Sequence, residues 1–133
     1  GLVLINEPEV SFFLRFFQFI LDDESWSFKV NIFNSKKNIF KSNNPWASNT
    51  AVAKLLFNDE DQFNRYFPEY KIVRNDFSEF FIFFNSGGVY NEVVYIPLNR
   101  FFLKLLDYID SILIFFLPSI FALNRTVILK KIK

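Results

Sequence analysis

Two short apolar segments, one near each end of the chain, constrain its fold more than any other feature. Residues 1–5 are Gly-Leu-Val-Leu-Ile, and residues 126–132 contain Val-Ile-Leu followed by lysines. Uninterrupted apolar runs of this length are typical of strands buried on both faces of a sheet. Because helical patterns fill the sequence between them, we predict an α/β arrangement and not a helical bundle. The 133 residues suffice for one domain.

The first predicted helix covers residues 10–21 and is rich in phenylalanine. Its polar residues are spaced by four, three and four positions, which places them along one face: Ser11, Arg15, Gln18 and Asp22. The opposite face is broad and aromatic, so we expect protein or a membrane surface to enclose it. Residues 22–44 mix serine, asparagine and lysine with isolated aromatic residues, and we assign them as irregular, with one short strand or hairpin at most.

Helix start signals mark the centre of the chain. Ser48 or Asn49 can cap a helix over the following residues to about position 57. The carboxylates of residues 59–61 suit the first turn of a second helix, where the helix dipole favours negative charge. Residues 70–77 have the mixed polar and β-branched character of a strand near a sheet edge.

Prolines divide the rest of the chain. Pro68 ends the second of these helices, and Pro97 is well placed as the first residue of a longer one. The apolar residues of that longer helix recur at helical spacing: Leu98, Phe101, Phe102, Leu105, Leu106 and Ile109. We predict that the apolar segment of residues 111–123 is helical up to Pro118.

Composition removes several classes of function. Cysteine and histidine are absent, which excludes disulfides, thiol nucleophiles, the usual zinc ligand sets and an imidazole base, and we expect no metal site. The net charge is +1 and the basic residues are scattered except near the C-terminal end, so nucleic acid is not an expected partner. The longest uncharged stretch, residues 111–124, is too short to cross a bilayer. With no signal-peptide pattern in the first residues, we expect a cytoplasmic protein, membrane-associated if its aromatic faces rest on lipid.

Three stretches, in chain order, carry a resemblance to a known family. Residues 1–8, Gly-Leu-Val-Leu-Ile-Asn-Glu-Pro, resemble the fifth strand of the class I (type 11-like) S-adenosylmethionine-dependent methyltransferases, a strand that often ends in Glu-Pro. Residues 63–77, with Tyr-Phe-Pro-Glu-Tyr-Lys-Ile-Val at positions 66–73, resemble the helix and sixth strand. Residues 125–131, Arg-Thr-Val-Ile-Leu-Lys-Lys, resemble the seventh strand, which in the family runs antiparallel to its neighbours and closes the sheet.

The resemblance implies a partial Rossmann-like methyltransferase sheet, made of the last three strands with the final one antiparallel, and a helical, Phe-rich insertion at about residues 78–124. Members with such an insertion often act on lipid-like or sugar acceptors, so a small-molecule acceptor of this kind is implied. The family binds S-adenosylmethionine through a Gly-rich turn and an acidic residue, and no Gly-x-Gly occurs here. We therefore expect residues 1–133 to be the C-terminal part of a methyltransferase domain. The cofactor-binding N-terminal half would be missing, and the chain alone would bind no cofactor and be inactive.

Candidate site residues follow from the rule that ligands of open α/β sheets bind beyond the carboxyl ends of the parallel strands. Asn6 and Glu7 would lie there as substrate-binding residues, with Glu7 as an orienting group or base. Trp46 is a candidate aromatic wall of the acceptor pocket. Each residue also has a plainer interpretation, because Glu7 can be a solvated residue where the chain leaves the strand and Trp46 can pack in the core. Residues 86–88, Ser-Gly-Gly, form either a hinge beside the pocket or a plain turn.

A function from a different class also fits the sequence. In this alternative the chain is a small non-enzymatic protein that attaches to a membrane or a partner through its aromatic helical faces. It predicts a folded monomer or binding to vesicles. The methyltransferase hypothesis instead leaves the edge of residues 2–5 unpaired, which predicts aggregation or strand pairing between chains.

Overall fold

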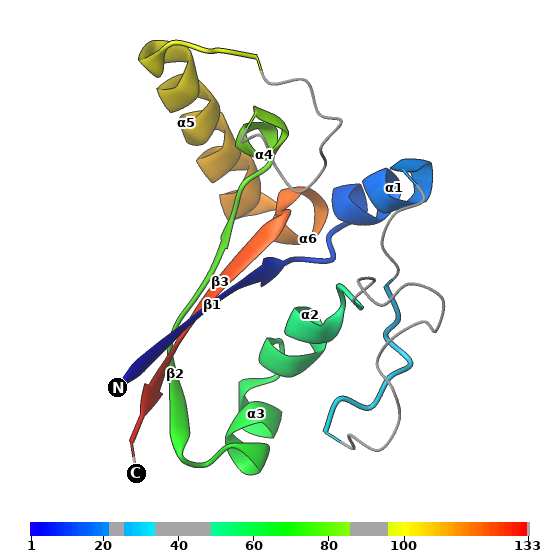
Figure 1. Ribbon diagram of the computed structural model, residues 1–133, viewed down its shortest axis with the longest axis vertical. Coiled ribbons are helices and arrows are strands. Elements are labelled where there is room, and N and C mark those ends of the chain that lie inside the picture. The colour runs from blue at the N-terminus through cyan, green and yellow to red at the C-terminus, as the bar shows by residue number, and fades with distance from the viewer. Residues whose placement is uncertain (22–25, 34–48, 86–95, 133) are drawn as a thin grey trace.

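The computed structural model describes residues 1–21, 26–33, 49–85 and 96–132. Trp46 and residues 86–88 lie outside the described residues. Figure 1 shows the helices and strands of the described residues. In chain order they are β1 (Leu2–Pro8), α1 (Phe12–Leu21), α2 (Val52–Phe57), α3 (Glu60–Tyr66), β2 (Tyr70–Ser78), α4 (Phe81–Asn85), α5 (Arg100–Phe116), α6 (Pro118–Phe121) and β3 (Asn124–Lys131).

The sheet has three strands in the order β1-β3-β2, and both pairings are antiparallel. β3 therefore lies in the middle, and β1 and β2 run parallel to each other on either side of it. The register places Val127 opposite Ile5 and Leu129 opposite Ile72, with an irregularity in β2 between Ile72 and Arg74. The predictions of a mixed α/β fold, of strands at both ends of the chain and of an edge strand at residues 70–77 are confirmed.

One face of the sheet packs against α2 and α3 (Figure 1). Alternate residues of β3 point to this face because successive side chains of a strand alternate. The buried residues of this cluster are Ala53, Phe57, Phe63, Ile72, Val127 and Leu129. The predicted acidic first turn is present in α3 at Glu60 and Asp61, and Asp59 is the N-cap, where its side chain accepts a hydrogen bond from the backbone N–H of Gln62 at 2.9 Å.

A second cluster lies where the carboxyl ends of β1 and β2 meet α1, α4, α5 and α6. Its buried residues are Val10, Leu14, Ala51, Phe80, Ile114, Ala122 and Leu123. Three phenylalanine rings contact one another here: the Phe13 ring centroid is 5.0 Å from that of Phe80 and 5.5 Å from that of Phe121, and the last two are 5.1 Å apart. Each such ring pair is worth about 1 kcal/mol beyond the area it buries, so the three rings stabilise this cluster.

Within the described residues, the aromatic face of the first helix is not enclosed as expected, because α1 turns its polar residues inward and leaves Phe12, Phe16 and Phe19 exposed. Ser11 and Gln18 are buried, whereas Phe19 exposes 85% of its surface. The polar groups find partners inside: Gln18 Nε2 donates to Thr50 Oγ1 at 3.2 Å, and Ser11 Oγ accepts from the Leu14 N–H at 3.2 Å. Hydrogen bonds formed only in the folded chain therefore decide which face is buried.

The predicted start of the long helix is also wrong. α5 begins at Arg100, three residues after Pro97, and Asn99 is its N-cap. The Asn99 side-chain oxygen accepts from the backbone N–H groups of Phe101 and Phe102 at 3.0 and 3.2 Å. An asparagine cap satisfies N–H groups that a proline cannot, so it sets the boundary. α5 continues to Phe116, and Pro118 is the first residue of α6.

β1 is not buried on both faces within the described chain, contrary to the expectation for residues 1–5. Leu2 and Leu4 each expose 69% of their surface, and Val3 is also exposed. β1 is an outer strand of the sheet, and the side chains of Leu2 and Leu4 point to the face opposite α2 and α3. No helix in the described ranges is long and apolar enough to span a bilayer.

Candidate functional site

Polar and charged side chains gather where β1 and β2 end and β3 begins. The register places Arg125 of β3 between Glu7 of β1 and Phe77 of β2. Because β1 and β2 run in the same direction, their carboxyl ends meet at this edge of the sheet. In open α/β sheets this is the edge at which ligands bind.

Asn6 is held on the sheet face opposite α2 and α3. Its Oδ1 accepts hydrogen bonds from Thr126 Oγ1 at 2.8 Å and from Asn124 Nδ2 at 3.0 Å. On the far side of Thr126 the register places Asp76, so polar groups cross all three strands. Asn6 Nδ2 makes no hydrogen bond to any described residue, so its two N–H groups are available to a bound molecule.

Glu7 lies in β1 next to Asn6, but the two side chains point to opposite faces, because side chains alternate along a strand. Glu7 is exposed and forms neither a hydrogen bond nor an ion pair within the part of the chain that the structure describes. The structure thus places Asn6 and Glu7 near the carboxyl end of β1 but does not direct them at a common point on one face. A molecule contacting both would have to reach around the end of β1.

The strongest electrostatic feature of this edge is a buried carboxylate between two cations. Glu9 Oε1 lies 2.8 Å from Lys54 Nζ, and Glu9 Oε2 lies 3.0 Å from Arg125 Nε. Glu9 and Arg125 expose 2% of their side chains and Lys54 exposes 25%. The group carries a net charge of +1, and only Lys54 reaches the surface.

Arg125 is held from several sides. Its Nη1 donates to the Ala53 carbonyl oxygen at 3.3 Å, and its Cζ lies 4.7 Å from the centre of the Phe77 ring. The contact with Glu9 is short but not aligned as a hydrogen bond, so Coulomb attraction is its main component. Burial lowers the pKa of the Arg125 guanidinium, and the nearby Glu9 carboxylate opposes this shift. The guanidinium nevertheless stays charged, as arginine does in proteins.

Both oxygens of Glu9 already face cations, so the carboxylate is engaged in contacts within the fold. The group fixes the end of β1 to α2 and to the start of β3. Lys54 adds a third connection, since its Nζ also donates to the Val10 carbonyl oxygen at 3.2 Å. The polar groups that remain free to act on a ligand at this edge are the Asn6 amide, the Glu7 carboxylate and the exposed part of Lys54.

Sequence reasoning missed Glu9, Lys54 and Arg125 as a group. The available signal was a pair of opposite charges beside two predicted strands, Glu9 just after the first and Arg125 at the start of the last. Burying either charge requires a partner, so such a pair favours a contact between these two positions. Lys54 carried no comparable signal, because only the position of α2 against the sheet brings it near Glu9.

A second buried carboxylate, Asp110 of α5, belongs to the fold. Its two oxygens accept hydrogen bonds from the backbone N–H groups of Phe80, Phe81 and Ile82, at 3.0, 2.9 and 3.0 Å. Phe80 directly precedes α4, and Phe81 and Ile82 are its first two residues, whose N–H groups a helix cannot pair within its own backbone. Asp110 therefore joins the start of α4 to α5. Glu79, the residue before Phe80, has a φ of 62°. Its carbonyl oxygen accepts a hydrogen bond from the Leu123 N–H at 2.9 Å.

Among the described residues, no three carboxylates lie close enough together to hold a metal ion. No protein-family model matches the chain, and no curated protein or solved structure matches it either.

Proposed function

We propose that this chain is the C-terminal, substrate-side portion of an S-adenosylmethionine-dependent methyltransferase and is inactive alone. The observation that carries the proposal is the position of the last strand. β3 lies between β1 and β2 and runs antiparallel to both, as the final strand runs against its neighbours in the family that the sequence resembles. Three strands in this order and direction make up one end of such a sheet.

The outer edge of β1 gives further support. The Glu9 N–H donates to Leu123 and the Lys131 N–H to Gly1, which fixes the alternation of hydrogen bonds along the β1-β3 pair. The N–H groups of Val3, Ile5 and Glu7 therefore point at β3, whereas those of the intervening residues point outward. With two exposed leucines beside it, this edge is suited to pair with a further strand.

The residues present do not fit S-adenosylmethionine. No Gly-x-Gly turn follows a strand, and the buried carboxylate after β1, Glu9, is already paired with Lys54 and Arg125 instead of being free for ribose hydroxyls. The cofactor-binding residues of the proposed enzyme would come from a preceding N-terminal half.

The contribution of this chain is then to hold the methyl acceptor. Methyl transfer depends mainly on in-line placement of two reactants, so fixed hydrogen-bond donors are of direct use. The Asn6 amide, fixed by Thr126 and Asn124, supplies such donors. Glu7 accepts the acceptor's proton where the attacking atom must lose one. The exposed phenylalanines of α1 favour a lipid-like acceptor over a sugar.

The test begins with the coding sequence directly upstream of Gly1. The proposal predicts an open reading frame that encodes a strand, a Gly-rich turn and an acidic residue about 20 positions further on. A stop codon immediately before Gly1 would refute it. In the protein expressed from that longer frame, transfer of a labelled methyl group is measured with Asn6→Ala, Glu7→Gln and, as a matched control, Asp61→Asn on the exposed surface of α3.

Asn6→Ala is expected to raise KM, and Glu7→Gln to lower kcat about a hundredfold or more if Glu7 acts as the base. The control should behave like the unchanged protein. Equal activity of all three variants would remove Asn6 and Glu7 from the site.

A second candidate, a non-enzymatic membrane-binding protein of the cytoplasm, is favoured by one observation. Along α1 the exposed face is apolar, and its members are Phe12, Phe16, Phe19 and Ile20. Such a face can rest at a lipid interface. This candidate predicts that the chain alone sediments with vesicles and that Phe16→Ser with Phe19→Ser abolishes the binding, whereas the methyltransferase proposal requires no vesicle binding.

A further inference from the structure

α5 exposes an apolar seam along its whole length. Its members are spaced alternately by four and three residues, and they are Phe101, Leu105, Tyr108, Ile112 and Phe115. The three aromatic members expose 70%, 65% and 79% of their surface. Alternation of four and three is the spacing at which one helix packs along another, because it keeps a single line of side chains facing the partner.

The seam is separate from the face that α5 uses within its own chain. Asp110 and Ile114 are buried on the other side of the helix, and Leu106, Ile109 and Leu113 are half-buried there. These inner residues account for the packing of α5 against α4, α6 and β2. Within the described residues, nothing covers the seam, although it holds larger side chains than the inner face.

We propose that the seam binds a second copy of this chain, with the two α5 helices antiparallel and crossing at Tyr108. The two ends of the seam are equidistant from Tyr108, since Phe101 and Phe115 each lie seven residues from it, and Leu105 and Ile112 lie three and four residues from it. A two-fold axis through Tyr108 places Phe101 of one copy against Phe115 of the other at both ends of the contact. A surface that matches itself under a two-fold rotation is the kind that closed dimers use.

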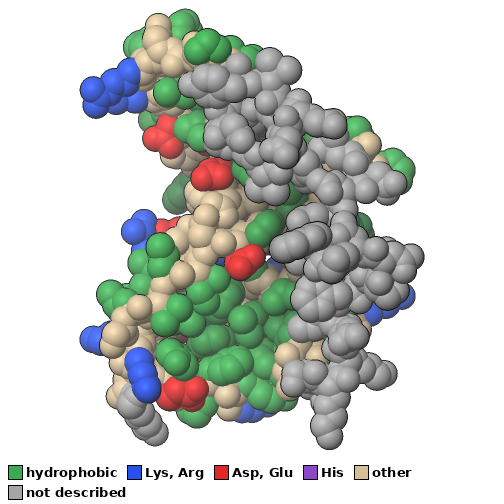
Figure 2. Space-filling view, viewed as in Figure 1, with side chains coloured by type: hydrophobic (Ala, Val, Ile, Leu, Met, Phe, Trp, Pro, Cys, Tyr) green, Lys and Arg blue, Asp and Glu red, His purple; other side chains and the backbone are tan. Residues whose placement is uncertain are grey.

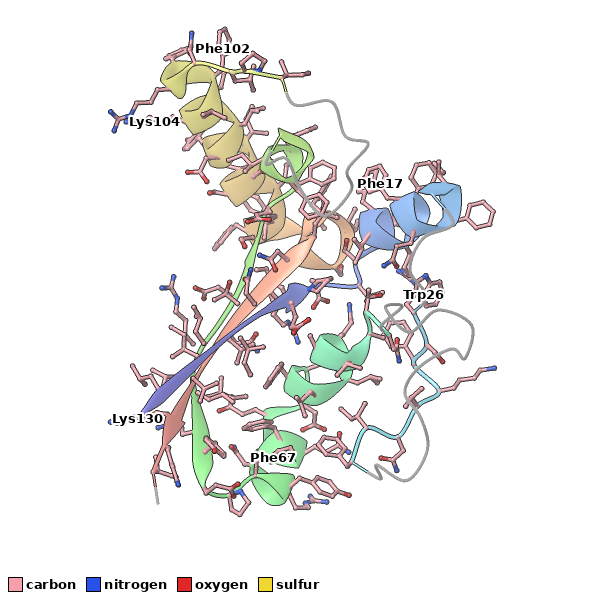
Figure 3. The ribbon with its side chains drawn as sticks, in the orientation of Figure 1. Phe17, Trp26, Phe67, Phe102, Lys104 and Lys130 are labelled. Carbon is pink, nitrogen blue, oxygen red and sulfur yellow. The ribbon has the colours of Figure 1, made fainter. Side chains whose placement is uncertain are left out.

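Charge supports the antiparallel direction. Arg100 and Lys104 are exposed in the first turns of α5, and Figure 3 shows Lys104 on the outer side of this helix. The last turn of α5 contains no basic residue, so the partial negative charge of its terminal carbonyl groups is not offset within the helix. Antiparallel docking brings Arg100 and Lys104 of one copy next to that end of the other, whereas parallel docking brings the two Lys104 side chains together.

The available surface is sufficient for a dimer. Phe102 and Phe116 flank the seam and are also exposed, and Figure 2 shows hydrophobic side chains together with lysine and arginine at this end of the molecule. The seven side chains would bury roughly 600 Å² per copy, or about 1,200 Å² in all, which enters the range of specific interfaces. A membrane is the weaker fit, because Asp107 is exposed directly beside Tyr108 and the polar flank is not uniformly basic.

Disulfide cross-linking tests the geometry, and the chain contains no cysteine of its own. Under mild oxidation, Tyr108→Cys should form a covalent dimer. Phe101→Cys alone and Phe115→Cys alone should not, but a mixture of the two should cross-link. The matched control is Phe19→Cys, at a phenylalanine on α1 that is more exposed than any of these three residues, and it should stay monomeric on a denaturing gel. Cross-linking of Phe101→Cys with itself would overturn the antiparallel arrangement.

Sedimentation equilibrium tests the dimer without a cross-link. The unchanged chain should have twice the monomer mass, Tyr108→Glu and Phe115→Glu should each sediment as monomers, and Phe19→Glu should remain a dimer. Circular dichroism of the monomeric variants should match that of the unchanged chain, which separates loss of the interface from loss of the fold. The proposal is overturned by a monomeric unchanged chain, including one that instead binds anionic vesicles. It does not rest on the proposed function, since α5 is distinct from the free edge of β1.

Discussion

Among single residues, Glu9, Lys54 and Arg125 form the main buried charged group of the described chain. Glu9 and Arg125 have lost nearly all contact with water, and each compensates for the desolvation of the other. Such a pair adds little net stability relative to apolar side chains of similar volume. Removing one partner, however, leaves a buried charge without compensation.

We therefore expect Glu9→Gln to reduce the free energy of unfolding by about 3 kcal/mol, because it leaves Arg125 buried and unpaired. The double variant Glu9→Leu with Arg125→Leu should lose less than the single variant. Lys54→Met should cost about 1 kcal/mol or less, since Lys54 is partly exposed. Urea denaturation of the four proteins measures these differences, and equal losses for the single and double variants would contradict the account.

Asp110 gives a second test with a control on the same helix. In Asp110→Asn one carboxylate oxygen becomes an amide that faces backbone N–H groups, so we expect a loss of about 2 kcal/mol. Asp107→Asn changes an exposed residue three positions away and should stay within about 0.5 kcal/mol of the unchanged chain. Thermal unfolding of both variants decides whether the Asp110 contacts hold α4.

At the scale of elements, the outer edge of β1 is the feature most open to misassembly. An apolar edge strand with unpaired N–H and C=O groups is a template for pairing with other chains. Leu4→Lys places a charge on this edge and, because Leu4 is exposed, should change stability by no more than about 0.5 kcal/mol. We expect the variant to aggregate more slowly than the unchanged chain, as followed by light scattering. Phe19→Lys adds the same charge away from the edge, so an equal effect would show that charge alone is responsible.

Local signals in the sequence were enough for some elements. α3 begins directly after Asp59 and ends before Pro68. The mixed polar and β-branched sequence of residues 70–77 correctly predicted β2 as an outer strand. In each case the determining interaction is short in sequence: a cap three residues from its donor, or a residue whose backbone cannot continue a helix.

Where the determining interaction spans the chain, the sequence did not predict it. The inward face of α1 depends on Gln18 meeting Thr50, and the buried pair depends on the register that brings Arg125 near Glu9. At the candidate site, Asn6 and Glu7 lie near the carboxyl end of β1, and their role in binding a substrate stays a prediction. The sequence analysis grouped them, whereas the two-residue period of a strand turns their side chains to opposite faces. The bonds that fix Asn6 required β3 as its neighbour.

At the scale of the whole molecule, two surfaces remain without a partner in the described chain. The edge and bare face of β1 present a row of outward N–H groups, and the α5 seam presents a line of large apolar side chains. The first is suited to a strand and the second to a helix, so the two surfaces call for different partners. We propose that the edge binds a preceding half of the same protein and that the seam binds a second copy.

We propose that this sheet continues beyond its outer strand β1. Hydrogen exchange of the backbone amides along β1 is the most direct test. The backbone N–H groups of Leu4 and Asn6 point outward. Those of Ile5 and Glu7 donate to β3 and serve as internal controls. We predict that Leu4 and Asn6 exchange rapidly in the 133-residue chain and slowly in the protein lengthened by its upstream coding sequence, while Ile5 and Glu7 stay protected in both. Rapid exchange of Leu4 and Asn6 in the lengthened protein would contradict the claim.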